Sequence, residues 1–131
     1  MTKENVNEKE KTRTLVLEGE VARLIVENGP DKGKEFSIDK PIVTIGRHPE
    51  NDICLLHDEI ISRFHGRISY SKDEGVYCYE DLNSTNGTTI CNKWFKKEKM
   101  KIKHGDKILI GRGSQLRFFT KKPGLKDWLL G

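Results

Sequence analysis

The chain has 131 residues, which leaves room for one domain of ordinary size. Charged residues make up 34% of it and apolar residues another 34%. This apolar share is low for a globular chain but higher than that of disordered chains. No apolar stretch approaches the roughly 18 residues of a transmembrane helix, and residues 1–11 lack the apolar core of a secretory signal. A membrane protein, a secreted protein and a two-domain enzyme are therefore not expected.

The net charge of +4 is unevenly distributed along the chain. Residues 1–92 hold 12 Lys or Arg against 17 Asp or Glu, a net charge of −5, whereas residues 93–131 hold 12 against 3, a net charge of +9. The basic C-terminal third would suit an anionic partner, although a solvated lysine-rich surface is the simpler interpretation. Aromatic residues do not alternate with arginines there as in a nucleic-acid groove, so we do not expect nucleic acid as the partner.

The three cysteines give no sign of a disulfide framework. Cys54, Cys78 and Cys91 are odd in number and are separated by 24 and 13 residues, which fits neither paired disulfides nor a C-x-x-C motif. We therefore expect reduced thiols in a cytoplasmic protein. Cys54, His57 and His65 come nearest to metal-ligand spacing, but a fourth ligand is missing, so we expect neither a metal nor a cofactor.

Short β-type segments separated by turns follow one another along the chain. A Lys- and Glu-rich start predicts a flexible tail over residues 1–20, and an extension is expected over 121–131. Turn signals every 8–12 residues between them predict an all-β sandwich or barrel over 21–120. The expected strands are, in chain order, 21–27, 34–38, 42–46, 53–55, 64–71, 76–79, 88–90, 100–103, 107–110 and 115–120.

Three loop segments carry polar groups that a plain turn does not need. Residues 46–53 read G-R-H-P-E-N-D-I, residues 61–66 read I-S-R-F-H-G and residues 81–88 read D-L-N-S-T-N-G-T. Together they supply guanidinium, hydroxyl and carboxamide groups at the ends of strands. These donors suit a multivalent anion such as phosphate, which takes a forked contact from arginine.

In that order, the motifs G-R-x-x-x-N-D-I, S-R-x-H-G and L-x-S-T-N-G-T resemble those of the forkhead-associated (FHA) domain family. The resemblance covers about residues 21–120 and includes a G-P-x-x-G hairpin at 29–33 and H-G-D-K-I at 104–108. It implies a β-sandwich of about eleven mostly antiparallel strands with ligand loops at one end. It also implies a signalling module that binds phosphothreonine peptides without catalysis.

The resemblance assigns four residues to the phosphate. Arg47 matches an arginine that contacts phosphate, and the hydroxyl of Ser62 matches a donor to a phosphate oxygen. Arg63 falls at a variable position that also faces the phosphate, and Thr85 matches a further contact through its hydroxyl or its main chain. Residues 56–61, between Leu55 and Ser62, depart from the family pattern, because they make the loop before Ser62 one residue longer than the common family spacing.

The remaining assignments concern the peptide and the support of the loops. Asn86 matches the carboxamide that holds the peptide main chain. Asn92 falls where many members place a second asparagine, although Lys93 replaces the glycine that follows it. The residues that the family uses to support the site are Asn51, His65, Gly66 and Gly87.

Other functional classes remain as alternatives. A scaffold that binds partners through a lateral sheet face, independently of phosphate, is the main alternative. An enzyme is disfavoured because Ser62 and His65 would point to opposite faces of a strand that begins at Phe64. We expect a monomer whose partner is a phosphothreonine-containing protein, the substrate of a serine/threonine kinase, with no role for nucleic acid or membranes.

Overall fold

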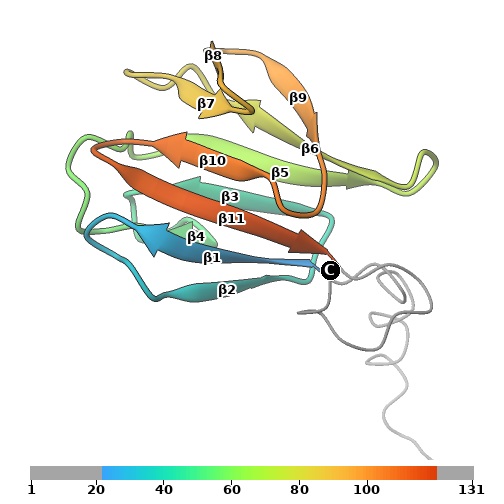
Figure 1. The fold of residues 1–131 in the computed structure, drawn as a ribbon, viewed down its shortest axis with the longest axis horizontal. Helices are drawn as coiled ribbons and strands as arrows, with labels where there is room; N and C mark the ends of the chain where they lie inside the picture. Colours follow the sequence, from blue (N-terminus) through green and yellow to red (C-terminus); the bar gives the residue numbers. More distant parts are fainter. Residues whose placement is uncertain (1–21, 121–131) are drawn as a thin grey trace, which may run out of the picture.

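The computed structural model describes residues 22–120, so the expected N-terminal tail and C-terminal extension lie outside the described residues. The described range contains strands and turns and forms no helix that could cross a membrane. Figure 1 shows the strands as two layers. They are β1 (Ala22–Asn28), β2 (Glu35–Ile38), β3 (Ile42–Gly46), β4 (Ile53–Cys54), β5 (Gly66–Ser71), β6 (Val76–Asp81), β7 (Thr88–Ile90), β8 (Lys93–Phe95), β9 (Lys99–Ile102), β10 (Lys107–Ile110) and β11 (Ser114–Thr120).

The strands form a six-stranded sheet in the order β2-β1-β11-β10-β7-β8 and a five-stranded sheet in the order β4-β3-β5-β6-β9. The β3–β4 pair is parallel, whereas the other pairs are antiparallel. The predicted sandwich of about eleven mostly antiparallel strands is confirmed. Ala22 pairs with Thr120, so the described range begins and ends at one end of the sandwich, opposite the β3–β4 and β4–β5 loops (Figure 1).

Alternating side chains place the core between the sheets. In β1, Ala22, Leu24 and Val26 are buried while the residues between them are partly exposed, and Leu116 and Phe118 of β11 lie opposite Val26 and Leu24 on the same face. This period of two is the pattern of a sheet with one face buried and one facing water. Burial of each large apolar side chain stabilises the sandwich by about 1.5–3 kcal/mol.

Two details of the strands differ from the sequence-based prediction. Strand β8 was not expected, and it forms because Cys91 and Asn92 adopt φ of 54° and 64° and close a tight hairpin after β7. The strand expected from Phe64 begins only at Gly66. The ring of His65 accepts the N–H of Ser62, and this bond closes a turn just before β5.

Candidate functional site

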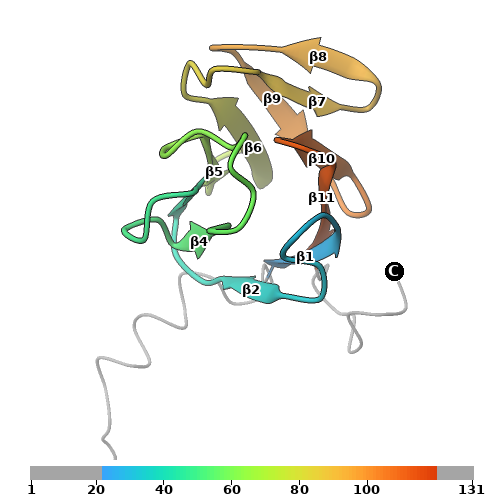
Figure 2. The same ribbon diagram turned by 90° about the vertical axis from the view of Figure 1, so that its left-hand side faces the viewer.

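The β3–β4 and β4–β5 loops are joined by main-chain hydrogen bonds at the end of the sandwich that Figure 2 views. Arg47 N donates to Ser62 O and His48 N donates to Arg63 O, both at 3.1 Å. Gly46 permits this approach, because a Cβ atom there would lie 2.1 Å from Arg63 O. The backbone therefore holds the two loops that carry the predicted phosphate contacts side by side.

The guanidinium of Arg47 is anchored to the β4–β5 loop. Its Nε donates to Ile61 O at 3.1 Å, and the residue is half-buried. Within residues 22–120, no group accepts a hydrogen bond from its two terminal nitrogens. A guanidinium that is fixed through Nε can offer these nitrogens as a forked, charge-assisted contact to an anion.

Ser62 connects the β4–β5 loop to the β6–β7 loop. Its Oγ accepts the N–H of Thr85 at 2.9 Å. A serine hydroxyl has one hydrogen to donate besides its lone pairs, so this bond leaves the hydroxyl hydrogen available. Thr85, Asn86 and Arg63 are exposed on the same loops. The structure therefore brings these four predicted site residues together with Arg47.

His65 is fully buried, and its two ring nitrogens bond Ser62 in its own loop and Gly87 in the β6–β7 loop. Nδ1 accepts the N–H of Ser62 at 3.1 Å, which leaves the proton on Nε2, 2.9 Å from the carbonyl oxygen of Gly87. Burial lowers the pKa of His65 below its ordinary value of 6.5, and the Gly87 carbonyl and Asp81 offset this only in part. The ring is therefore a neutral crosslink at neutral pH.

Asn51 and Gly66 occupy positions where the packing allows little else. The Asn51 carboxamide is 6% exposed, and its Nδ2 donates to His48 O at 2.9 Å and to Arg63 O at 2.7 Å. Its Oδ1 has no hydrogen-bond partner among the described residues. A Cβ atom at Gly66 would lie 2.3 Å from the hydroxyl oxygen of Tyr79. Asn51 thus clamps the β3–β4 loop, and Gly66 admits a buried tyrosine.

Asp81 organises the β6–β7 loop and was not singled out from the sequence. Its carboxylate accepts hydrogen bonds from Ser84 N at 2.9 Å, from Ser84 Oγ and Thr88 Oγ1 at 2.7 Å, and from Lys97 N at 3.1 Å. Ser84 Oγ in turn accepts the N–H of Gly87. Burial raises the pKa of Asp81, but the hydrogen bonds from Ser84 and Thr88 outweigh it, so the pKa lies below its ordinary value. Aspartate side chains in turns commonly accept hydrogen bonds from nearby N–H groups. The position of Asp81 at the start of a turn was therefore the signal in the sequence that could have indicated this role.

Asp58 fixes the β4–β5 loop to the turn between β10 and β11. Its buried carboxylate accepts hydrogen bonds from Ile60 N at 3.0 Å, Arg112 N at 2.8 Å and Ser114 Oγ at 2.6 Å. Residues 56–61 therefore form a structured connection. The pairing with Arg112 could not be predicted, because 54 positions separate the two residues.

Asn92 does not join the other predicted site residues. Thr88, at the start of β7, follows the β6–β7 loop, whereas Asn92 lies in the turn beyond the other end of that strand. The neighbouring Cys91 Sγ is 3.7 Å from Asp106 Oδ1, in the turn that precedes β10. Asparagine is favoured at positive φ, so turn geometry accounts for this residue.

Ser62 and His65 contact each other, but not as a nucleophile and base. The expectation that they point to opposite faces is wrong because Phe64 precedes β5 and does not begin it. The contact runs from Ser62 N to Nδ1, and Nε2 faces Gly87 O, so the neutral ring has no lone pair for the hydroxyl. Nowhere in the described part of the chain do three or more His, Cys, Asp or Glu residues come together to hold a metal ion.

The fold is a β-sandwich, and the loops at one of its ends present hydrogen-bond donors. These features are those of a β-sandwich binding module. The chain belongs to the FHA domain family, since the model of that family matches residues 43–111, more than half of the 131 residues. The family resemblance seen in the loop motifs is thereby confirmed.

Comparison with known proteins gives relatives and a solved structure of the same fold. The chain is 37% identical over 91 residues to an oxoglutarate dehydrogenase inhibitor of Corynebacterium efficiens. These 91 residues are 70% of this chain and 61% of the relative. It is 33% identical over 91 residues to the glycogen accumulation regulator GarA of Mycolicibacterium smegmatis, covering 70% and 54% of the two chains. The chain therefore spans less than two thirds of the length of either relative.

The fold is similar to that of an FHA domain solved in work on phosphothreonine-dependent FHA domain interactions. The TM-score is 0.64 at 28% sequence identity, and the alignment covers 75% of this chain and 94% of the other. This likeness extends over nearly the whole of the solved domain.

Proposed function

We propose that this domain binds protein segments that carry a phosphothreonine, and that it does so without catalysis. The observation that carries the proposal is a pair of available donors at the loop end, namely the terminal nitrogens of Arg47 and the hydroxyl hydrogen of Ser62. The main-chain bond from Arg47 N to Ser62 O keeps both on one surface. Among residues 22–120, the site offers fixed donors to an anion, and both nitrogens of the nearby His65 ring are engaged elsewhere than at the Ser62 hydroxyl.

A phosphate group matches these donors in charge and geometry. It carries about −1.5 to −2 charges at pH 7 and three acceptor oxygens. Arg47 can take two of the oxygens in a fork, and the Ser62 hydroxyl can donate to the third. Arg63 and Thr85 are exposed beside them and add a second positive charge and another donor. Hydrogen bonds to a charged group contribute about 1.5–3 kcal/mol each, enough for a transient signalling interaction.

Asn86 is suited to hold the main chain next to the phosphothreonine. Its side chain is exposed, while its own carbonyl is fixed by the indole N–H of Trp94 at 3.0 Å. A carboxamide has both a donor and an acceptor, so it can pair with a peptide unit. The named work on phosphothreonine-dependent FHA interactions supports this choice of ligand.

We further propose that the domain acts as a regulator of other proteins in the cytoplasm. The relatives are named an oxoglutarate dehydrogenase inhibitor and a glycogen accumulation regulator, which supports a partner that is itself a target of regulation. A serine/threonine kinase would create the ligand by phosphorylating that partner. The three free thiols suit a reducing compartment. We also propose that the partner is a protein and that the domain is a monomer.

The test is a phosphothreonine peptide library presented to the full chain beside its dephosphorylated copy. We expect selective retention of phosphorylated peptides. Arg47→Ala should reduce the affinity by at least roughly 10- to 150-fold, the loss that corresponds to a single charge-assisted hydrogen bond. Lys72→Ala is the matched control: it removes one exposed positive charge from the β5–β6 turn, away from the loops. Equal retention of both libraries, or equal losses in the two variants, would overturn the proposal.

A further inference from the structure

The turn between β8 and β9, residues 96–98, lies at the loop end of the sandwich, beside the β6–β7 loop (Figure 2). Phe95, the last residue of β8, pairs with Thr88 at the start of β7. Lys99, the first residue of β9, pairs with Glu80 near the end of β6. Both pairings place the turn at the same end as the predicted phosphate contacts, although none of its residues is among them.

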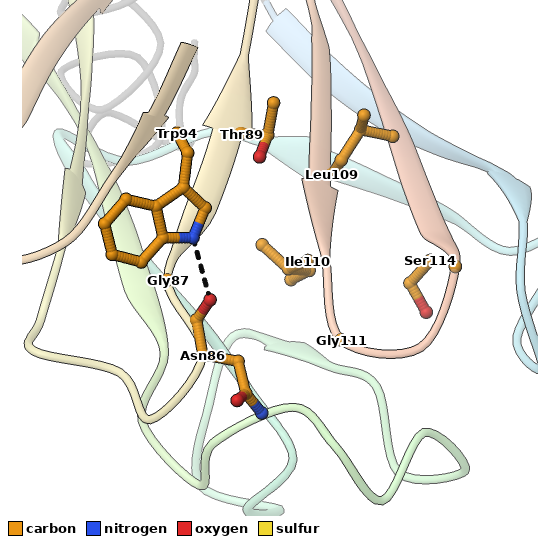
Figure 3. Close-up of a pocket in the computed structure, with 9 residues that line it drawn as sticks. Asn86, Gly87, Thr89, Trp94, Leu109, Ile110, Gly111 and Ser114 are labelled. Atoms are coloured by element: carbon orange, nitrogen blue, oxygen red, sulfur yellow. Dashed lines mark hydrogen bonds between the residues drawn. The ribbon is translucent and has the colours of Figure 1, made fainter. Parts of the chain in front are cut away.

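Hydrogen bonds fix this turn to the β6–β7 loop. Asp81 N donates to Glu98 O at 2.9 Å, and Lys97 N donates to Asp81 Oδ1 at 3.1 Å. Strand β8, which leads into the turn, is tied to the same loop, because Trp94 Nε1 donates to Asn86 O at 3.0 Å (Figure 3). The turn is therefore held at a fixed place relative to the loop that carries Asn86.

Positive charge is concentrated in this turn and in the strands on either side of it. Residues 93–103 contain six lysines and one glutamate. Lys96 and Lys97 in the turn and Lys99 at the start of β9 are all exposed. We call these three residues the β8–β9 lysine cluster. Like charges at such close positions repel one another, so an anion beside the cluster would be stabilising.

Within residues 22–120, none of the three ammonium groups of the cluster forms an ion pair with an Asp or Glu. Glu80, the cross-strand partner of Lys99, is engaged by Arg67, whose Nε and Nη2 lie 3.0 Å and 2.9 Å from Glu80 Oε1. Asp81 is 1% exposed, and its carboxylate is occupied by N–H and hydroxyl groups around the β6–β7 loop. The charge of the cluster is therefore available to an anion from outside the domain.

Acidic side chains of the phosphorylated partner complement this cluster in charge and in position. An extended peptide spans about 3.3–3.6 Å per residue, so residues a few positions from a phosphothreonine held at Asn86 reach the turn that is bonded to the same loop. A lysine ammonium is a point charge on a flexible stem and lacks the forked geometry that arginine offers a phosphate. It therefore suits carboxylates at variable positions along a peptide.

We propose that the β8–β9 lysine cluster binds acidic side chains that flank the phosphothreonine of the partner, and that it selects among phosphorylated partners by their charge. This inference rests on the proposed function and adds a second contact beside the phosphate. The phosphate then decides whether a segment binds, and the cluster decides which phosphorylated segment binds more tightly. Exposed ion pairs are individually weak, so the selection comes from several of them together.

The experiment measures the affinity of the full chain for matched phosphothreonine peptides. One peptide carries a run of glutamates on one side of the phosphothreonine, its copy carries glutamines at the same positions, and such a pair is made for each side. We expect the glutamate peptide of one pair to bind roughly 2- to 25-fold more tightly, because each of two exposed ion pairs changes affinity by about 1.4- to 5-fold. The preference should decrease at high salt, which screens exposed charges.

Lys96→Gln combined with Lys97→Asn should remove most of this preference, measured against the glutamine peptide on the same variant. Asparagine tolerates the φ of 58° at position 97, and the bond to Asp81 comes from the main chain, so the turn keeps its place. The matched control combines Lys72→Gln with Lys107→Gln. It removes the same charge from two exposed positions, in the β5–β6 turn and at the start of β10, away from the loop end, and should keep the preference.

The outcomes distinguish the two proposals. If the chain retains phosphopeptides but binds the glutamate and glutamine copies equally, or if both double variants lose the preference equally, the inference about the cluster is wrong and the proposed function stands. If phosphorylated and unphosphorylated peptides are retained equally, both fall. A short DNA duplex of random sequence that binds the full chain and is released only by the Lys96 and Lys97 substitutions would also overturn the inference, because it would assign the cluster to nucleic acid.

Discussion

The main-chain N–H of Ser62 donates to Nδ1 of His65 at 3.1 Å, and this single bond makes the shape of the loop depend on the protonation state of the ring. The proton of the neutral ring is on Nε2 and faces Gly87 O. A second proton would have to enter at Nδ1, where the N–H of Ser62 already points. Protonation therefore breaks the bond that closes the turn from Ser62 to His65, whereas Nε2 keeps its bond to Gly87 O in the β6–β7 loop.

We expect the free energy of unfolding to decrease as the pH falls below about 6.5. The pKa of folded His65 is lowered by burial, whereas the unfolded chain takes up a proton near the ordinary value of 6.5. The unfolded state therefore binds more protons in this window, and the contribution of His65 is fully present only above it. Denaturant titrations from pH 7.5 down to 5 measure the loss. A slope that is unchanged in His65→Gln would assign the pH dependence elsewhere.

Asn51→Asp should destabilise the domain by about 2–4 kcal/mol and weaken phosphopeptide binding. The substitution replaces the Nδ2 amino group and its two N–H donors by one acceptor oxygen that faces the carbonyls of His48 and Arg63, and it places a charge where the residue is 6% exposed. Chemical denaturation and peptide titration measure the two effects. Glu50→Gln, an exposed neighbour, is the control and should change neither quantity appreciably.

Asp58→Asn should cost about 1.5–3 kcal/mol of stability, because the new amide places a donor among the donors Arg112 N, Ile60 N and Ser114 Oγ. The neighbouring Glu59→Gln is a matched change of charge at an exposed position. Thermal and denaturant unfolding compare the two. Equal stabilities would mean that Asp58 does not hold the β4–β5 loop to the β10–β11 turn.

A glutamate in place of phosphothreonine should be a poor ligand. A carboxylate has one charge and two oxygens, against nearly two charges and three oxygens in the phosphate. The donors of Arg47 and Ser62 would be left partly unpaired. Calorimetric titration of a phosphopeptide and its Thr→Glu copy makes the comparison, and affinities within twofold of each other would contradict the proposed site.

The strands and the loop end could be predicted because both depend on local signals. Alternation such as that of Leu24 and Val26 marks a half-buried strand, and the loop motifs keep their order along the chain. Strand β8 escaped prediction because it is three residues long and exposes Trp94. Asp58 escaped because two of its partners, Arg112 and Ser114, lie more than 50 positions away, which no local pattern reveals.

The assignment of individual ligand contacts remains a prediction, and Asn92 shows why the motif alone is not enough. Its type and position match a family asparagine, but a φ of 64° in a hairpin turn is a sufficient reason for asparagine there. Arg47, Ser62 and Asn86 are different, because the loops gather them at one end of the sandwich with hydrogen-bonding atoms to spare.

Because Ala22 pairs with Thr120, the order of the strands along the polypeptide could be changed without changing the fold. Antiparallel partners have Cα atoms about 5 Å apart, so a short linker would join these two positions without distorting the sheet. New ends could then be opened in the exposed β5–β6 turn at residues 72–75, which is also remote from the β3–β4 loop (Figure 1). The loop end would survive such a circular permutation, because it does not depend on the direction from which the chain enters the sandwich.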